Sequence, residues 1–92
     1  MEKATVEKWL NRMVRATKQF VNIEDLSDEF KWCNHNVHKV PDRPYVQLYN
    51  CLHEIAEMFD FEVTVDYESD KDICYMFTYK GVDFVQLDDK EN

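Results

Sequence analysis

The chain has 92 residues, of which 45% are hydrophobic and 14% aromatic, and its formal net charge is −8. These values predict one domain over residues 1–92 and exclude a disordered chain, because there is enough apolar surface for a core. The charge argues against direct binding to nucleic acid or an anionic membrane, which repel an acidic surface, unless the basic first helix acts alone.

The charge is sorted along the chain. Residues 1–23 carry five basic residues against two acids, whereas residues 46–92 carry twelve acids against three lysines. An uneven field of this kind steers and selects partners. The pattern therefore favours a protein partner with a basic surface.

Helical periodicity is clearest in the first 21 residues, with Thr5 as the expected N-cap. The apolar stripe comprises Val6, Trp9, Leu10, Met13, Val14, Phe20 and Val21. Lys8, Arg12 and Arg15 lie on the opposite side at spacings that form a basic ridge. A ridge of this kind is either a solvated helix face or a docking surface for an acidic group.

Two further helices are expected before the strands. The first covers about residues 24–34, and a loop over residues 36–44 follows it because Pro41 and Pro44 forbid a continuing helix. Asp42 then caps a third helix with Pro44 in its first turn. The apolar stripe of this third helix comprises Tyr45, Leu48, Tyr49, Leu52, Ile55, Ala56 and Phe59.

Three strands are expected after Asp60, where the hydrophobic period changes to two. They run over residues 61–68, 73–79 and 82–88, and Lys80-Gly81 forms a two-residue turn between the last two. The fold class is thus α+β, with three N-terminal helices followed by a three-stranded antiparallel β-meander. The same order of elements occurs in a winged helix.

The register of the first strand is open between two solutions. In one, Val63, Val65 and Tyr67 share the core face with Cys74 and Met76. In the other, which buries more aromatic area and is favoured, one core face carries the aromatic set and the acids lie opposite, around Met76. That aromatic face comprises Phe61, Val63, Val65, Tyr67, Ile73, Tyr75, Phe77, Tyr79 and Phe84. The opposite face carries Glu62, Asp66, Glu68 and Asp83 around Met76, Val85 and Leu87.

No constellation of residues indicates catalysis, so the chain is not expected to be an enzyme or to need a cofactor. A zinc site built on Cys33, His35 and His38 is a weaker alternative, since those residues with Cys51 or His53 would supply four ligands. The cysteine spacing fits no disulfide framework, and no apolar run spans a bilayer or resembles a signal peptide. These features predict a cytoplasmic protein with reduced thiols.

The sequence favours a small acidic inhibitor or regulator, of the type encoded by phages and mobile elements. It would occupy a basic, nucleic-acid-binding surface of a partner protein, partly by mimicking DNA through a row of carboxylates. The expected partner-binding residues are Glu62, Asp66, Glu68, Asp70, Asp83, Tyr75 and Met76. The alternative is a homodimer in which the basic helix of one copy docks on the acidic sheet of another.

Overall fold

The protein, described by a computed structural model over residues 2–19, 35–38 and 42–90, combines helices and strands in the α+β class. The described elements are α1 (Lys3–Gln19), β1 (His35–His38), β2 (Tyr45–Leu48), α3 (Leu52–Phe59), β3 (Thr64–Glu68), β4 (Asp72–Tyr79) and β5 (Val82–Asp89). The second helix expected from the sequence, over residues 24–34, lies outside the described residues.

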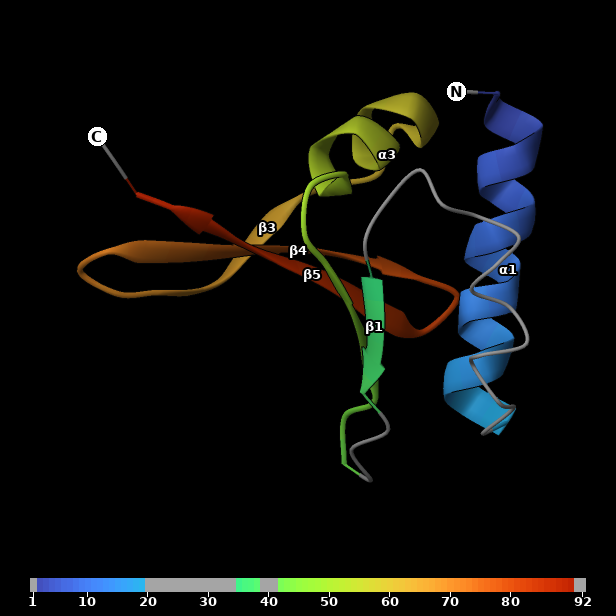
Figure 1. Cartoon of the computed structure of the whole chain (residues 1–92), viewed down its shortest axis with the longest axis horizontal. Coiled ribbons are helices and arrows are strands. Elements are labelled where there is room, and N and C mark those ends of the chain that lie inside the picture. The colour runs from blue at the N-terminus through green and yellow to red at the C-terminus, as the bar shows by residue number, and fades with distance from the viewer. Residues whose placement is uncertain (1, 20–34, 39–41, 91–92) are drawn as a thin grey trace.

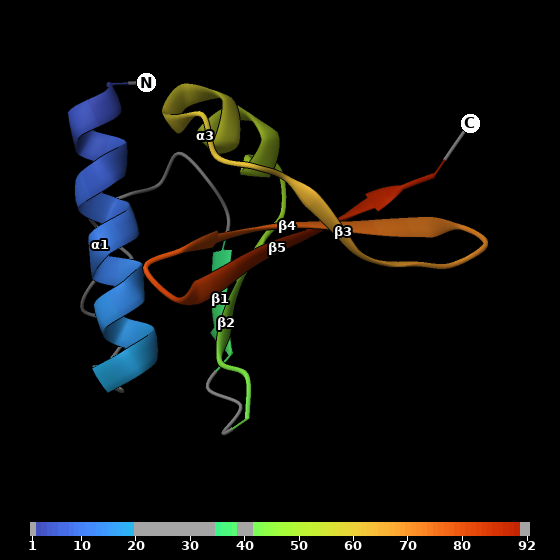
Figure 2. The same cartoon turned by 180° about the vertical axis from the view of Figure 1, so that it is seen from behind.

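The strands form one mixed sheet in the order β1-β2-β5-β4-β3. The antiparallel pairing of β3 with β4 and of β4 with β5 follows the predicted order, but β3 begins at Thr64 and not at residue 61. The sheet also contains β1 and β2, with β2 parallel to β5. Figures 1 and 2 show the β4–β5 ribbon projecting past the helices, with the β3–β4 turn at the end farthest from α1. The prediction of a three-stranded sheet was therefore incomplete.

Strand β2 replaces the first part of the predicted third helix. Val46 and Leu48 are fully buried and lie opposite Phe84 and Gln86 of β5, whereas Tyr45 and Gln47 point to the other face. A run of four residues fits both periodicities, and pairing with β5 and β1 selects the strand. The helix begins only at Leu52, so the prediction of a helix capped by Asp42 was wrong.

Strand β1 overlaps the predicted loop over residues 36–44 and pairs antiparallel with β2. Its sequence, His-Asn-Val-His, contains a single β-branched residue, so it carries little intrinsic strand preference. The neighbouring strand supplies the hydrogen-bonding edge that makes this segment extended. The loop prediction was therefore wrong for residues 36–38.

Helices α1 and α3 both pack on one face of the sheet (Figure 2). The apolar stripe of α1 is confirmed from Val6 to Met13, and Trp9 lies 6.3 Å from the ring centroid of Phe84. The buried cluster comprises Val6, Trp9, Leu10, Met13, Val46, Leu48, Cys51, Leu52, Ile55, Ala56, Phe77, Val82 and Phe84. Every member lies on a helix, at a helix start, or on the helix-covered side of a strand.

The N-terminus of α1 differs from expectation in one detail. Thr5 lies inside the helix, which begins at Lys3, and its hydroxyl donates to the Glu2 carboxylate at 3.2 Å. Thr5 is therefore not the N-cap. On the basic ridge, Lys8 and Arg15 are exposed and Arg12 is partly covered.

The tight turn between β4 and β5 has the predicted residues and pairing. Lys80 and Gly81 both have positive φ, at 51° and 82°, as a type I′ turn requires. The turn sets Tyr79 opposite Val82 and Phe77 opposite Phe84. This register places the aromatic side chains of β4 against α1 and α3, as the favoured solution expected.

A β-bulge interrupts the pairing of β3 with β4 between Val65 and Tyr67. Val65 lies opposite Tyr75 on the helix-covered face, whereas Tyr67 lies opposite Cys74 on the other face. The extra residue at a bulge breaks the alternation, so neither predicted register holds along the whole strand. The favoured register assigns Val65, Asp66 and Asp83 to the correct sides of the sheet, but it is wrong for Tyr67 and Glu68. Val65 is also 50% exposed and is not part of the buried core.

One cysteine departs from the prediction of reduced thiols. Cys51, the residue before α3, is buried and disulfide-bonded, and its bonding partner is not among the described residues. Cys74 is a free, buried thiol. Sequence spacing does not reveal which thiols approach one another, because disulfide geometry depends on tertiary structure.

Candidate functional site

The side of the sheet that carries neither α1 nor α3, here called the open face, gathers the polar residues of the strands. Because side chains alternate along a strand, the register assigns one set of residues to it. The set comprises Asn36, His38, Tyr45, Gln47, Thr64, Asp66, Tyr67, Asp72, Cys74, Met76, Thr78, Asp83, Val85, Leu87 and Asp89. This face is the candidate functional site.

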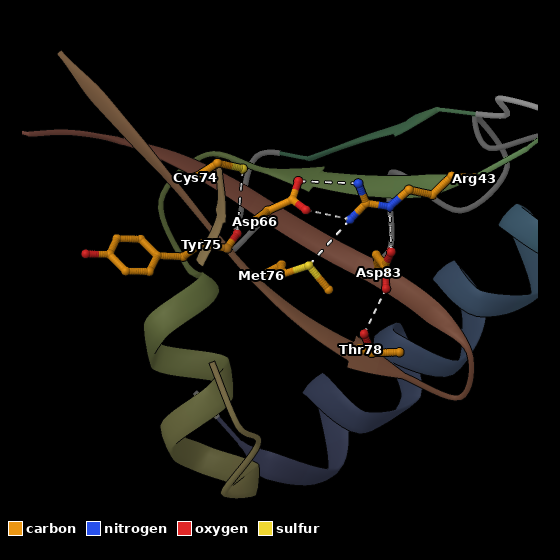
Figure 3. Close-up of polar contacts among 7 residues, drawn as sticks. All are labelled: Arg43, Asp66, Cys74, Tyr75, Met76, Thr78 and Asp83. Atoms are coloured by element: carbon orange, nitrogen blue, oxygen red, sulfur yellow. Dashed lines mark hydrogen bonds and ion pairs between the residues drawn. The ribbon is translucent and has the colours of Figure 1, made fainter. Parts of the chain in front are cut away.

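Arg43 forms the centre of a polar cluster on the open face (Figure 3). Its Nε donates to Asp83 at 2.7 Å, and its Nη1 and Nη2 donate to the two oxygens of Asp66 at 3.3 and 3.2 Å. Nη2 also lies 3.4 Å from the sulfur of Met76, and Thr78 donates to Asp83 at 2.8 Å. The guanidinium thus bridges β3 and β5 across β4.

The electrostatics of the cluster are those of one cation shared by two carboxylates. Hydrogen bonds to Asp83 and Asp66 raise the pKa of Arg43, so it stays charged throughout the physiological range. The Arg43 side chain is 47% exposed, and solvated ion pairs of this kind contribute about 0.2–1 kcal/mol each. The cluster carries a net charge of −1 but has no unpaired carboxylate.

A recess of about 310 Å³ adjoins this cluster on the open face. The described residues that line it are Arg43, Tyr45, Gln47, Asp66, Tyr67, Cys74, Val85 and Leu87. Cys74 and Val85 are buried, whereas Tyr67 and Leu87 are 53% and 44% exposed. The recess therefore combines apolar and aromatic surface with one carboxylate, one amide and the already paired Arg43.

The Cys74 thiol in the recess is held in its neutral form. Burial raises its pKa, and the charge of Asp66 raises it further, against a smaller opposing effect of Arg43. The thiolate, not the thiol, is the reactive species, and catalytic cysteines therefore lie where their pKa is lowered. The environment of Cys74 has the opposite effect on its pKa. A catalytic role for Cys74 is not supported.

We expect alkylation of Cys74 by iodoacetamide to rise at a higher pH in the folded protein than in the urea-unfolded protein. A raised pKa shifts thiolate formation to higher pH, whereas in urea-unfolded protein the midpoint should return to about 8.5. The rate is measured by mass spectrometry of the labelled peptide across pH 7–11. A midpoint in the folded protein at or below that of the unfolded protein would contradict the assignment.

The residues expected to bind a partner do not form one surface. Asp66, Asp83 and Met76 meet at Arg43, but Tyr75 points away to the helix-covered side, where its ring packs edge-on against His53 at 4.8 Å (Figure 3). The expectation that either Tyr75 or Met76 lies outside is met by Met76. The register that exposed Tyr75 as a surface anchor was therefore wrong for this residue.

The remaining predicted acids lie apart from the Arg43 cluster. Glu68 is opposite Ile73, and its carboxylate pairs with Lys90 at 2.7 Å. Glu62 precedes β3, and Asp70 lies in the β3–β4 turn; both are exposed. The predicted row of free carboxylates along β3 is thus broken by the bulge and partly neutralised by Arg43 and Lys90.

Two acids on the open face were not among the predicted site residues. Asp72 and Asp89 lie directly opposite each other at the projecting end of the β4–β5 ribbon. Among the described residues neither has an ion-pair partner. The sequence could have revealed this pair, because the register set by the Lys80-Gly81 turn places Asp72 opposite Asp89 when it is extended to the end of the hairpin.

The described ligands of the proposed zinc site do not converge. His35 packs against Trp9 on the helix-covered side, whereas His38 stacks on Tyr45 at 4.6 Å on the open face. Successive odd and even positions of a strand point to opposite sides of the sheet. Within residues 2–19, 35–38 and 42–90 there is no group of three potential ligands, and Cys33 lies outside them.

Known proteins provide no assignment for this arrangement. No protein family, curated protein or solved structure matches the chain. None of the helices in the described part of the chain has the length and apolar character needed to cross a membrane. The geometry and charge of the open face are therefore the basis of a functional hypothesis.

Proposed function

We propose that this protein is a small acidic interaction domain whose open face binds a basic surface of another protein. In this role it acts as an inhibitor or regulator that competes with nucleic acid for the same basic surface, as phage and mobile-element proteins do.

The acid pair Asp72 and Asp89 is the observation that supports the proposal most directly. Like charges directly opposite each other across two strands destabilise a sheet, and these two lie opposite each other on adjacent strands. A cationic group of a partner placed between them would relieve the repulsion. Complementary charge of this kind steers association and selects the partner.

Exposed apolar side chains adjoin this pair on the open face. Tyr67 and Leu87 are 53% and 44% exposed, and they precede the end of the ribbon where Asp72 and Asp89 lie. Aromatic and aliphatic anchors beside charged groups are the usual composition of an interface. Tyr67 and Leu87 therefore replace Tyr75 as the anchors of the proposed interface.

Charge reversal on the open face tests the proposal. The chain is used to capture proteins from its native host, and capture by an Asp72→Lys, Asp89→Lys double variant is compared with capture by wild type. The matched control is Glu54→Lys, Glu57→Lys, which changes the net charge equally at exposed positions on α3. We expect the first variant to lose a captured basic protein at least about tenfold and the control to retain it.

Duplex DNA added to the complex should release the captured protein, because both ligands would occupy one basic surface. Equal losses in both double variants would indicate net charge alone and contradict the proposal, as would unchanged capture by both. Recovery of an untagged copy of this chain as the sole ligand would instead support the homodimer, with α1 of one copy on the open face of another.

A further inference from the structure

We infer that the recess on the open face is a receptor for one long cationic side chain, lysine or arginine, of the bound partner. The inference deepens the proposed function and rests on it for the identity of the partner as a basic protein. The site itself is defined by residues of this chain and is testable without that protein.

The charge of the recess selects a cation. Four of the five N–H groups of Arg43 are directed at Asp83, Asp66 and the sulfur of Met76, which leaves one N–H on Nη1 (Figure 3). The net charge of −1 on Arg43, Asp66 and Asp83 together therefore favours a cation over an anion. Each oxygen of Asp66 accepts one of these bonds, and a carboxylate oxygen can accept two. Asp66 can therefore accept a further donor from a ligand.

The walls of the recess suit the stem of such a side chain. Val85, Cys74 and Leu87 provide apolar surface, along which the methylene groups of lysine or arginine can lie while the charged head reaches Asp66. The volume of about 310 Å³ is large enough for one side chain.

Two tyrosine rings complete the site. Tyr45 is held by stacking on His38, with 12° between the ring planes, and Tyr67 stands exposed at the recess. Aromatic rings attract ammonium and guanidinium groups through the negative charge of their faces. In a regular strand the consecutive residues Asp66 and Tyr67 would point to opposite faces of the sheet. The bulge between Val65 and Tyr67 breaks this alternation, so both residues line the same recess.

The test is a titration of isotope-labelled protein, followed by amide NMR, with N-acetyl-arginine amide and N-acetyl-lysine amide. We expect saturable shifts at Asp66, Tyr67, Cys74 and Leu87 with a Kd on the order of 1 mM. N-acetyl-glutamine amide and N-acetyl-aspartate amide should give none. If the acidic compound instead produces the same shifts, Arg43 is the recognition group and the inference is wrong.

Asp66→Asn and Asp83→Asn form a matched pair of variants. Each removes one carboxylate from Arg43 and changes the net charge equally, but only Asp66 lines the recess. We expect Asp66→Asn to weaken binding at least about fivefold and Asp83→Asn to change it less than twofold. Equal effects would overturn the inference. Should Asp66→Asn fail to fold, Tyr67→Leu, at an exposed position, replaces it with the same fivefold expectation.

The two proposals fail separately. If neither cationic amide binds while capture still depends on Asp72 and Asp89, the recess assignment is wrong and the interaction domain stands. If the amides bind the recess but the charge reversal leaves capture unchanged, the recess stands and the proposed docking surface is wrong.

Discussion

Replacement of Phe84 by alanine is expected to destabilise the protein by about 3–5 kcal/mol, the usual range for removing a large buried aromatic side chain. Phe84 is fully buried, stacks on Phe77 at 5.1 Å with 11° between the rings, and also contacts Trp9 of α1. It lies on β5 between β2 and β4, so the cavity would open where the helix meets the centre of the sheet. A loss of this size is a large share of the 5–15 kcal/mol that is typical of a domain.

The measurement is urea unfolding followed by circular dichroism, with the midpoint compared at constant slope. Leu87→Ala is the control, because Leu87 is on the same strand but exposed on the open face, and such positions change stability by about 0.5 kcal/mol or less. Similar midpoints for the two variants would show that Phe84 is not central to the core.

Replacement of Gln86 by leucine is expected to cost about 1–3 kcal/mol, although leucine has a similar size and is apolar. The buried Gln86 side chain accepts a hydrogen bond from the Leu52 N–H at 2.9 Å and donates to Asp88 at 2.8 Å. Cys51, the residue at the N-cap of α3, makes no side-chain capping bond. The strand therefore supplies the acceptor that the helix start lacks.

Amide hydrogen exchange at Leu52 separates this effect from a general loss of packing. In Gln86→Leu we expect the protection of the Leu52 amide to fall more than that of Phe77 or Val46, which lie within the sheet. Gln47→Leu, on the open face of β2, should leave the protection of Leu52 unchanged. Equal loss of protection at all of these amides would mean that Gln86 contributes through packing alone.

The C-terminal half of the fold follows from local sequence patterns. A run that is apolar on both sides at residues 73–79 and the Lys80-Gly81 turn specify β4, β5 and their register, because a two-residue turn with positive φ allows one pairing. The amphipathic stripe of α1 is equally local. These elements were predicted because the information that determines them lies within a few residues.

The N-terminal strands and the centre of the site depend on distant contacts. Tyr45–Leu48 satisfies both a helical and an alternating pattern, and β5, almost 40 positions away, decides between them. Arg43 gave no local signal, since its carboxylate partners are 23 and 40 residues further along the chain. The position of Tyr67 on the open face could not be predicted, because the sequence around it alternates without interruption and gives no sign of the bulge in β3.

The position of β5 in the sheet has a consequence for the order of folding. β5 comes last among the described elements, yet it occupies the middle place and alone joins β1–β2 to β3–β4 (Figure 1). During synthesis on the ribosome, the two strand pairs can form early but cannot combine until residues 82–89 have emerged. Because such a non-local closure is slow compared with hairpin formation, the nascent chain should expose its unfinished sheet edges until β5 has been synthesised. The joining of β2 to β5 should then limit the folding rate.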